Sequence, residues 1–364
     1  TANGYACAPG SFTVGSWSYA SGVLSSAAAS YSDAGAFSWE VEDRNFADVD
    51  GADSTKKQRY FRSNTVLYTG RFVPASYQLT LNSPLLQTFG SACAARSFTY
   101  LGQPFGYAVA PSVTVRAMNG AAAPAQTVNY LGVIGSGGIW KLASPMLYNS
   151  AACTAPTQTC AMTRLDAASK TRFTATYGYT PIPATALPGW ATLTPAMVGN
   201  ADIISSNNGS GTLSFGATDR LALRRDTAIA PDPVTQTPFN ANMTLTLQLD
   251  DLSEAGVAGN PAAISGTLAA APLPFDAGDQ FRLGRLRLMN AYGSELLPMR
   301  VPVRSEFYTG NGWNINGNDS CTSLPLNAFA GSNVVGAAPA IAAATPNPLP
   351  LINGQATLIF NATN

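Results

Sequence analysis

Residues 244–250 read TLTLQLD, and the fold class of the chain follows from their pattern. Its apolar residues Leu245, Leu247 and Leu249 alternate with polar ones, so they share one face of an extended strand. The same alternation recurs in residues 37–42 (FSWEVE), 112–116 (SVTVR) and 172–177 (RFTATY). Clusters of Gly and Asn separate such stretches. The pattern predicts an all-β fold of tandem antiparallel, immunoglobulin-like β-sandwich modules with long loops.

The composition excludes several classes of function. The 364 residues include 20 basic and 20 acidic side chains and no histidine. Without histidine, the chain cannot itself supply a Ser-His-Asp triad, a Cys-His pair or a histidine metal ligand. A net charge of zero argues against a nucleic-acid partner, because binding phosphates requires an excess of Lys and Arg.

The cysteines and the low charge indicate an extracellular protein without a membrane span. No apolar run approaches the about 20 residues that cross a bilayer. The short polar loop between Cys153 and Cys160 predicts a local disulfide, since C-x6-C without histidine is a poor zinc site. Cys7–Cys93 is the next pair expected, which leaves Cys321 unpaired or with a partner beyond residue 364. The ends of the chain suggest a mature protein or a piece of a longer one.

Three modules are expected from the proline-rich and glycine-rich breaks in the strand pattern. They are an N-terminal β module at 1–73, a β-sandwich module at 74–210 and a C-terminal β-sandwich module at 211–364. Within the last module, residues 281–288 (FRLGRLRL) place apolar side chains first in one phase and then in the other. A bulge at Gly284-Arg285 would keep all of them on the core side.

Several segments resemble one known family. They include residues 70–74 (GRFVP), 98–105 (FTYLGQPF), 281–298 (FRLGRLRLMNAYGSELLP) and 318–322 (NDSCT), and the matches run from about Tyr31 to Thr322. Together they resemble the large uncharacterised domain of MshQ-like proteins, which are associated with the mannose-sensitive haemagglutinin class of type IV pili in Gram-negative bacteria.

The resemblance implies an extracellular or outer-membrane-exposed location and a pilus-linked or adhesive role. It implies no catalytic residues. Its expected partners are pilus or surface protein subunits. The lectin-like module and the terminal segment of such proteins are absent here, so the chain resembles a fragment that lacks both, in keeping with an unpaired Cys321.

Carboxylates form three candidate sites. Asp48, Asp50 and Asp53 surround a glycine and could bind calcium through oxygen ligands, although the bidentate glutamate of an EF-hand is missing; the alternative is a solvated turn. Calcium is the one cofactor that the sequence suggests.

Glu40 and Glu42 would face the same side of a strand, and paired carboxylates can perform acid–base chemistry. The alternative is a polar face beside an arginine. The third cluster is Asp250, Asp251 and Glu254, which otherwise ends a strand in a turn.

Basic and aromatic residues suggest binding surfaces. Residues 224–225 and Arg282, Arg285 and Arg287 give local basic density, either paired internally with Asp226, Asp279 and Glu295 or presented to a partner subunit. Trp313 and Asn314 lie in a Gly/Asn-rich turn, where an exposed aromatic ring could stack on a sugar. Most other aromatic residues are expected in the core.

Three functions are therefore in competition. The first is a non-enzymatic structural or adhesive surface protein, and the second is a carbohydrate-binding surface module. The third is a hydrolase that depends on paired carboxylates. Strands near both ends of the chain also suggest self-association through sheet edges.

Overall fold

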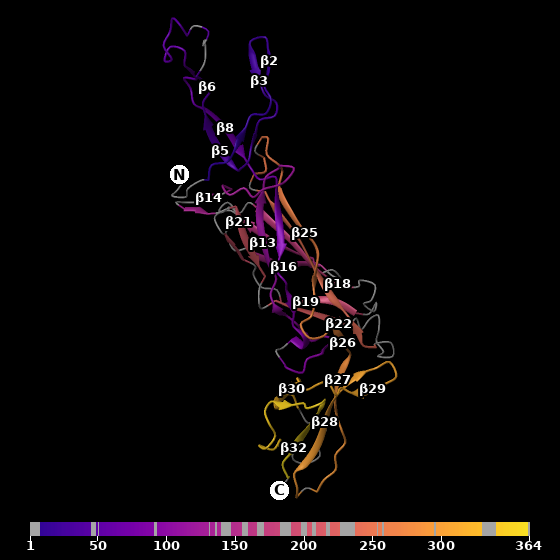
Figure 1. The fold of residues 1–364 in the computed structure, drawn as a ribbon. Helices are drawn as coiled ribbons and strands as arrows, with labels where there is room; N and C mark the ends of the chain where they lie inside the picture. The colour runs from indigo at the N-terminus through magenta and orange to yellow at the C-terminus, as the bar shows by residue number, and fades with distance from the viewer. Residues whose placement is uncertain are drawn as a thin grey trace.

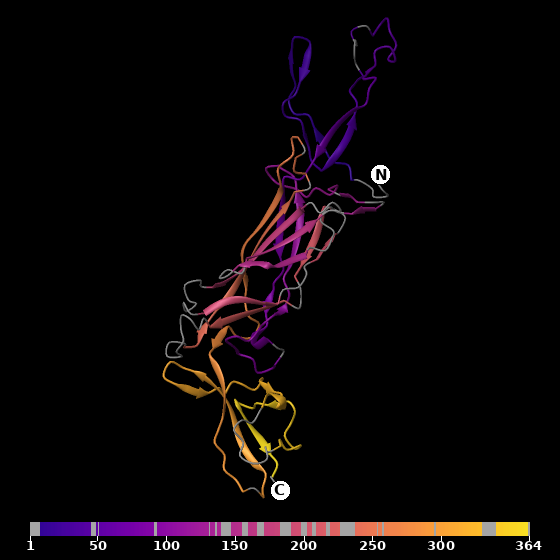
Figure 2. The same ribbon diagram turned by 180° about the vertical axis from the view of Figure 1, so that it is seen from behind.

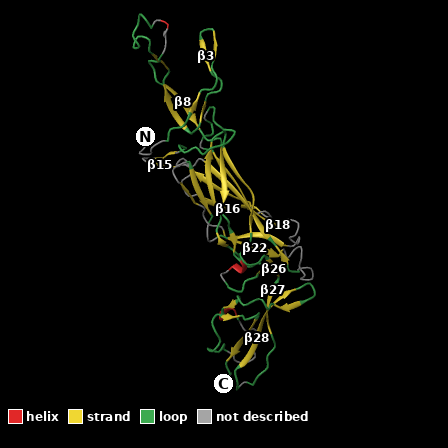
Figure 3. Cartoon of the chain, viewed as in Figure 1, coloured by secondary structure: helices red, strands yellow, loops and turns green. Residues whose placement is uncertain are grey.

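The computed structural model describes residues 8–44, 49, 51–90, 93–130, 132–134, 137–139, 147–154, 159–165, 171–182, 191–197, 202–205, 209–215, 219–225, 237–252, 254–256, 258–294, 296–329 and 340–362. Strands dominate this part of the chain (Figure 3), together with the short 3₁₀ turns η2 (Thr88–Gly90) and η4 (Leu326–Ala328). The prediction of an all-β fold is confirmed. None of the helices in the described ranges has the length and hydropathy needed to cross a membrane.

The molecule is elongated, with its modules arranged end to end along one axis. Figure 1 shows the N-terminal strands at one end, a central pair of packed sheets, and the C-terminal strands at the other end. The view from behind in Figure 2 shows the same order. The sandwich and the C-terminal part each bury a core of apolar side chains, as expected when a sheet hides one face against another layer.

The N-terminal part consists of short paired strands. They are β1 (Phe12–Thr13), β2 (Ser18–Ala20), β3 (Val23–Ser25), β4 (Ser30–Tyr31), β5 (Gly35–Trp39), β6 (Glu42–Asp43), β7 (Phe61–Arg62) and β8 (Leu67–Phe72). Phe37 packs between Tyr31 and Phe72, with ring centroids at 4.6 and 5.8 Å. Other large side chains here remain exposed, including Tyr19 at 74% and Tyr68 at 83%. This part therefore has only a small apolar cluster of its own.

The central part is a sandwich of two main sheets. The larger sheet has the order β16-β17-β18-β24-β25 and the smaller one β20-β21-β13-β9. Their strands are β9 (Ser76–Leu81), β13 (Ser112–Met118), β16 (Leu147–Thr154), β17 (Thr159–Leu165), β18 (Thr171–Ile182), β20 (Asp202–Ser205), β21 (Ser210–Ser214), β24 (Asn242–Asp251) and β25 (Ile264–Leu273). All neighbours within these two sheets are antiparallel.

Smaller sheets flank the two main ones. Their strands are β10 (Leu85–Leu86), β11 (Phe98–Tyr100), β12 (Tyr107–Val109), β14 (Gly132–Ile134), β15 (Gly137–Ile139), β19 (Ala191–Met197), β22 (Arg220–Arg225), β23 (Phe239–Asn240) and β26 (Gln280–Arg282). In the sheet β11-β26-β23, β11 runs parallel to β26 and aligns Tyr100 with Arg282. This sheet brings the end of β11 next to the point where the chain leaves the sandwich.

The alternation of residues 244–250 produces the sandwich core. Leu245, Leu247 and Leu249 on β24 are fully buried, and they join Val113 and Tyr177 of neighbouring strands in one cluster. Fully burying one leucine side chain contributes about 1.5–3 kcal/mol to the free energy of folding. The polar residues between them face away from this core, as the pleat of a strand requires.

The sheets link segments that are distant in the sequence. β18 and β24 lie on opposite sides of the expected break at residue 210, yet they pair from Phe173 with Asp251 to Ile182 with Asn242. β13 likewise pairs with β21. Residues 74–210 and 211–273 therefore contribute to the same sheets.

The C-terminal part has its own small core. Its strands are β27 (Gly284–Leu288), β28 (Met299–Tyr308), β29 (Trp313–Ile315), β30 (Ser323–Leu324), β31 (Leu349–Pro350) and β32 (Gln355–Phe360). β28 pairs with β27, β29 and β32. Val303, Leu349, Leu351 and Leu358 form the centre of its core.

The expected bulge in residues 281–288 is wrong. Phe281 is buried in the sandwich, but Leu286 and Leu288 are 47% and 50% exposed. The apolar phase changes because β26 ends in the sandwich and β27 begins the C-terminal part, with only Leu283 between them. Residues 281–288 therefore belong to two modules, and their apolar side chains do not share one core.

Candidate functional site

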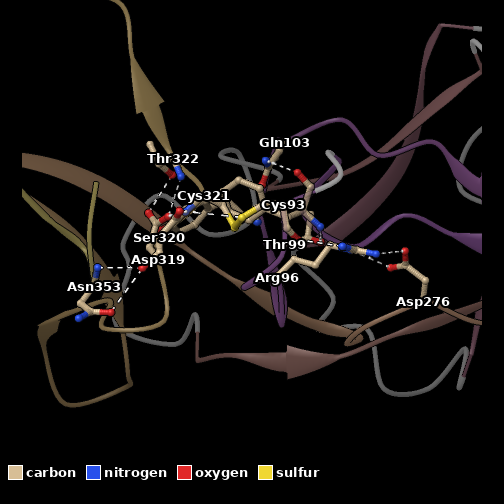
Figure 4. Close-up of a disulfide and its surroundings, with 12 residues drawn as sticks. Cys93, Arg96, Thr99, Gln103, Asp276, Asp319, Ser320, Cys321, Thr322 and Asn353 are labelled. Carbon is tan, nitrogen blue, oxygen red and sulfur yellow. Dashed lines mark hydrogen bonds and ion pairs between the residues drawn. A yellow bond between two sulfur atoms is a disulfide. The ribbon is translucent and has the colours of Figure 1, made fainter. Parts of the chain in front are cut away.

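The junction between the sandwich and the C-terminal part is fixed by a disulfide. Cys93 precedes β11, and Cys321 lies in the turn before β30; the two are 228 residues apart in sequence with their Cα atoms 5.6 Å apart. Figure 4 shows this bond between the loop that carries Arg96 and the turn that carries Asp319. The bond joins two modules with separate cores, so it limits their relative movement directly.

Tyr100 connects the modules beside the disulfide. Its hydroxyl donates to Asp319 Oδ2 at 2.8 Å and accepts from Asn316 Nδ2 at 2.7 Å. Both Asp319 and Asn316 are fully buried. Burial and the negative charge of Asp319 raise the pKa of Tyr100 above its ordinary value, so the phenol stays protonated as a donor. We refer to Tyr100 as the junction tyrosine.

The turn that receives the junction tyrosine is organised by Asp319. Its Oδ1 accepts the backbone N–H of Thr322 at 2.9 Å, and its Oδ2 accepts the Thr322 hydroxyl at 2.8 Å. The backbone N–H of Gly354 donates to the Asp319 carbonyl at 2.7 Å. Short-range bonds from an aspartate to the following residues are typical of turns. They hold Cys321 in the position that the disulfide requires.

Arg282 fills the space at the end of β26. Its guanidinium lies 4.5 Å from the ring centroid of Phe98 and 4.5 Å from that of Phe307, one from each module. It also donates to Asn316 Oδ1 at 2.5 Å. Burial lowers the pKa of Arg282 from its ordinary value, but an arginine remains cationic at neutral pH. The side chain thus bridges the modules through ring contacts and a hydrogen bond.

On the sandwich side, an ion pair supports the loop of Cys93. Arg96 Nη2 lies 2.7 Å from Asp276 Oδ2, and Arg96 Nη1 donates to the Cys93 carbonyl at 2.8 Å. Burial acts to raise the pKa of Asp276, but hydrogen bonds from Arg96 and Thr88 outweigh it and hold the pKa below its ordinary value. This pair fixes the cysteine loop onto the sandwich.

A cleft opens along the same junction. It has a volume of about 540 Å³ and is lined by Leu101, Gly102, Arg224, Arg225, Leu283, Gly284 and Trp313. The arginines come from β22, the glycine turn follows β11, and the tryptophan begins β29. Figures 1 and 2 both place β22 and β29 on the same side of the molecule. The cleft therefore lies between the two modules.

Comparison with protein families gives two matches to the chain. The third domain of DUF6701, an uncharacterised family, matches residues 33–273, and its fourth domain matches residues 282–363. The chain belongs to the DUF6701 family. No curated protein and no solved structure matches it. The disulfide and the cleft therefore lie between the third and fourth DUF6701 domains.

The predicted disulfide pattern needs correction. Cys93 pairs with Cys321, so the expectations of a Cys7–Cys93 bond and of an unpaired Cys321 are wrong. The error arose because pairing follows the folded arrangement of the third and fourth domains rather than proximity in sequence. Cys7 lies outside the described residues. Cys153 and Cys160 lie on the adjacent strands β16 and β17, and their bond stays a prediction.

The structure separates the two residues of the predicted ligand site. Trp313 lines the cleft, and its ring lies 4.1 Å from the guanidinium of Arg285. Asn314 is exposed, and its amide donates to Thr309 Oγ1 at 3.2 Å. Of the pair, Trp313 is therefore the residue placed to contact a ligand in the cleft.

The structure shows internal partners for Arg285, Arg287 and Asp279, whereas pairing with Asp226 and Glu295 stays a prediction. Arg285 and Arg287 both pair with Glu306, at 2.7 and 3.7 Å, and the Glu306 side chain is only 5% exposed. Asp279 instead accepts a hydrogen bond from Asn242 at 3.0 Å. Asp226 and Glu295 lie outside the described residues. Cross-strand pairing of β27 with β28 determines the choice, because it places Arg285 opposite Glu306.

The paired glutamates of the N-terminal part each bind an arginine. Glu40 pairs with Arg62, and Glu42 pairs with Arg44. The Tyr60 hydroxyl also donates to Glu42, at 2.6 Å. The hydrogen bonds from Tyr60 and Arg44 lower the pKa of Glu42, which keeps it ionised rather than ready to donate a proton.

The carboxylate cluster of Asp250, Asp251 and Glu254 lies at the end of β24 in the sandwich. Asp251 is buried and accepts hydrogen bonds from Tyr77 at 2.9 Å and Tyr130 at 3.0 Å. Glu254 is also buried, and Arg71 at the end of β8 pairs with it at 2.6 Å. Buried carboxylates require such partners. Glu254 and Arg71 therefore tie the N-terminal strands to the sandwich.

The calcium prediction falls mostly outside the described residues. Asp48 and Asp50 are not described, and Asp53 is exposed in a turn. Across the described ranges, no group of three or more metal-binding side chains is placed to hold an ion. Calcium binding at these aspartates stays a prediction.

Sequence reasoning missed the residues that form the junction. The junction tyrosine, Asn316 and Asp319 were not singled out, although the motif NDSCT places an aspartate two residues before a cysteine. That spacing is the local signal for an aspartate-stabilised turn that positions a thiol. The partner across the junction has no local signal.

Proposed function

We propose that this chain is a non-enzymatic structural and adhesive component of a bacterial surface assembly. One observation carries the proposal: the third and fourth domains are joined by a disulfide and by only one residue between β26 and β27. A junction that short and cross-linked suits a protein that holds a fixed extended shape. Catalysis needs no such arrangement.

The chemistry of the disulfide supports an extracellular location. Disulfides persist in oxidising compartments and are rare in reducing ones. Only 11% of the residues are charged, a composition typical of extracellular β proteins. We place the protein outside the cytoplasm, on the cell surface or outer membrane of a Gram-negative bacterium.

The resemblance to MshQ-like proteins supports a finer assignment. We propose association with a type IV pilus of the mannose-sensitive haemagglutinin class, with pilus or surface subunits as partners. Exposed aromatic side chains at the N-terminal end, such as Tyr19 and Tyr68, favour contact with another protein there. Self-association through sheet edges is a second possible contact of the same kind.

Surface labelling and cross-linking on intact cells test this proposal. A membrane-impermeant reagent should label the protein, and cross-linking should recover it with pilin subunits. A cytoplasmic protein with reduced cysteines would contradict the proposal. Recovery of the protein from the surface without any pilus subunit would contradict the finer assignment alone.

We propose carbohydrate recognition as a second candidate function. It is favoured by one observation, the position of Trp313 in the wall of the junction cleft. Binding on a glycan array that disappears in Trp313→Leu would support it. Absence of any glycan signal for the correctly folded protein would count against it.

A further inference from the structure

The junction cleft combines cationic and aromatic groups on opposite modules. Arg224 and Arg225 come from the third domain, and Trp313 comes from the fourth. Among the lining residues that the structure describes, none carries a carboxylate. Arg224 is exposed to solvent, so its guanidinium is available to a ligand. The charge of the described lining therefore favours an anion.

Guanidinium groups bind oxyanions. Arginine presents its donors in a planar fork that matches the two oxygens of a carboxylate. Adjacent residues on one strand point to opposite faces, so of the two lining arginines on β22 the exposed Arg224 is the one offered to a ligand. The arginine side of the cleft can thus bind a carboxylate group.

The aromatic wall is held in place before any ligand arrives. The Trp313 ring packs against Tyr308 with centroids 5.7 Å apart, and the Arg285 guanidinium lies 4.1 Å from it. Arg285 is in turn paired with Glu306 at 2.7 Å. A fixed ring loses little freedom on binding, which favours stacking against the apolar face of a sugar.

The floor of the cleft does not favour an extended peptide. The backbone N–H of Leu101 donates to the Arg282 carbonyl at 2.9 Å, and that of Gly102 donates to the Leu223 carbonyl at 2.7 Å. Peptides that add to a sheet use free main-chain donors and acceptors. These two donors are already used, so neither can pair with an added strand.

We propose that the junction cleft binds a short acidic saccharide, with a uronate carboxylate on Arg224 and a sugar ring against Trp313. The volume of about 540 Å³ lies within the range of about 300–1,000 Å³ found for small-ligand sites. The inference rests on the second candidate function, carbohydrate recognition, and names its ligand class. The structural role of the disulfide can hold without it.

Titration calorimetry with defined trisaccharides tests the inference. Trigalacturonate and trimannuronate are the acidic probes, maltotriose is the neutral probe, and triglutamate is the acidic peptide probe. We expect at least one acidic trisaccharide to bind, and the binding to weaken in high salt because the attraction between charges is screened. Maltotriose and triglutamate should bind at least about tenfold more weakly.

Variants locate the site. Arg224→Gln should weaken binding of the acidic trisaccharide about tenfold, and Trp313→Leu should weaken it similarly. Arg116→Gln, at an exposed arginine on β13 of the third domain, and Arg300→Gln, at an exposed arginine on β28 of the fourth, are the matched controls and should change nothing. Circular dichroism checks that each variant folds, and Arg224→Gln carries the test if Trp313→Leu does not fold.

The outcomes separate the inference from the function on which it rests. Equal binding of maltotriose and the acidic probes would overturn the acidic ligand and leave carbohydrate recognition standing. Binding of none of the saccharides would overturn both. Preference for triglutamate, or acidic binding unchanged in Arg224→Gln, would overturn the inference.

Discussion

Removing the disulfide should destabilise the junction by an amount set by the length of chain it closes. Cys93 and Cys321 are separated by 228 residues. In the chain-entropy description, a cross-link over that length lowers the entropy of the unfolded chain enough to stabilise the fold by about 5 kcal/mol. Cys93→Ala, Cys321→Ala and the double variant should each lose this amount.

Equilibrium unfolding in urea, under oxidising conditions, measures the loss. The five tryptophans lie on both sides of the junction, with Trp313 in residues 282–363, so their summed fluorescence follows unfolding of the whole chain. If the bond exists, either single substitution removes all of it, and the double variant is no less stable than the single ones. Losses that add across the two single variants, or losses near zero, would show that the bond does not stabilise the junction.

Three further perturbations test the junction and the sandwich. Gly284→Ala should cost about 1–3 kcal/mol, since an added Cβ would clash with the ring of the junction tyrosine, whereas Gly293→Ala, which has room, should change urea stability by less than about 0.5 kcal/mol. Tyr77→Phe should cost about 1.5–3 kcal/mol in thermal or urea unfolding, because it removes a hydrogen bond to the buried Asp251; an unchanged stability would contradict this role. The lowered pKa of Asp276 means that its contribution is present above the ordinary aspartate value of about 3.9 and is lost as the pH falls through the lower folded value; Asp276→Asn should therefore flatten the acid limb of a stability–pH curve, and an identical curve would argue against it.

The core could be predicted from the sequence because its signal is local. Leu245, Leu247 and Leu249 alternate over seven residues, and a strand with that pattern buries one face whichever neighbours it acquires. The same rule gives a wrong prediction at residues 281–288, where the alternation predicts a single strand that packs on one core. The change of phase instead marks the passage from β26 to β27, and nothing local distinguishes a bulge from a domain boundary.

The junction could be predicted only in part. The Gly/Asn context identified Trp313 as an accessible aromatic residue, and it does line the cleft. The partner of Cys321 was mistaken, because pairing over 228 residues depends on how the third and fourth domains meet. Arg224 was singled out by charge, but its proximity to Trp313 follows from the fold alone.

Proteolysis of the native protein without reduction, followed by mass spectrometry, shows directly whether a covalent bond joins the third and fourth domains. We expect one cross-linked pair of peptides that contains Cys93 and Cys321. Recovery of both residues as free thiols, or of Cys93 joined to Cys7, would show that no such bond connects the two domains.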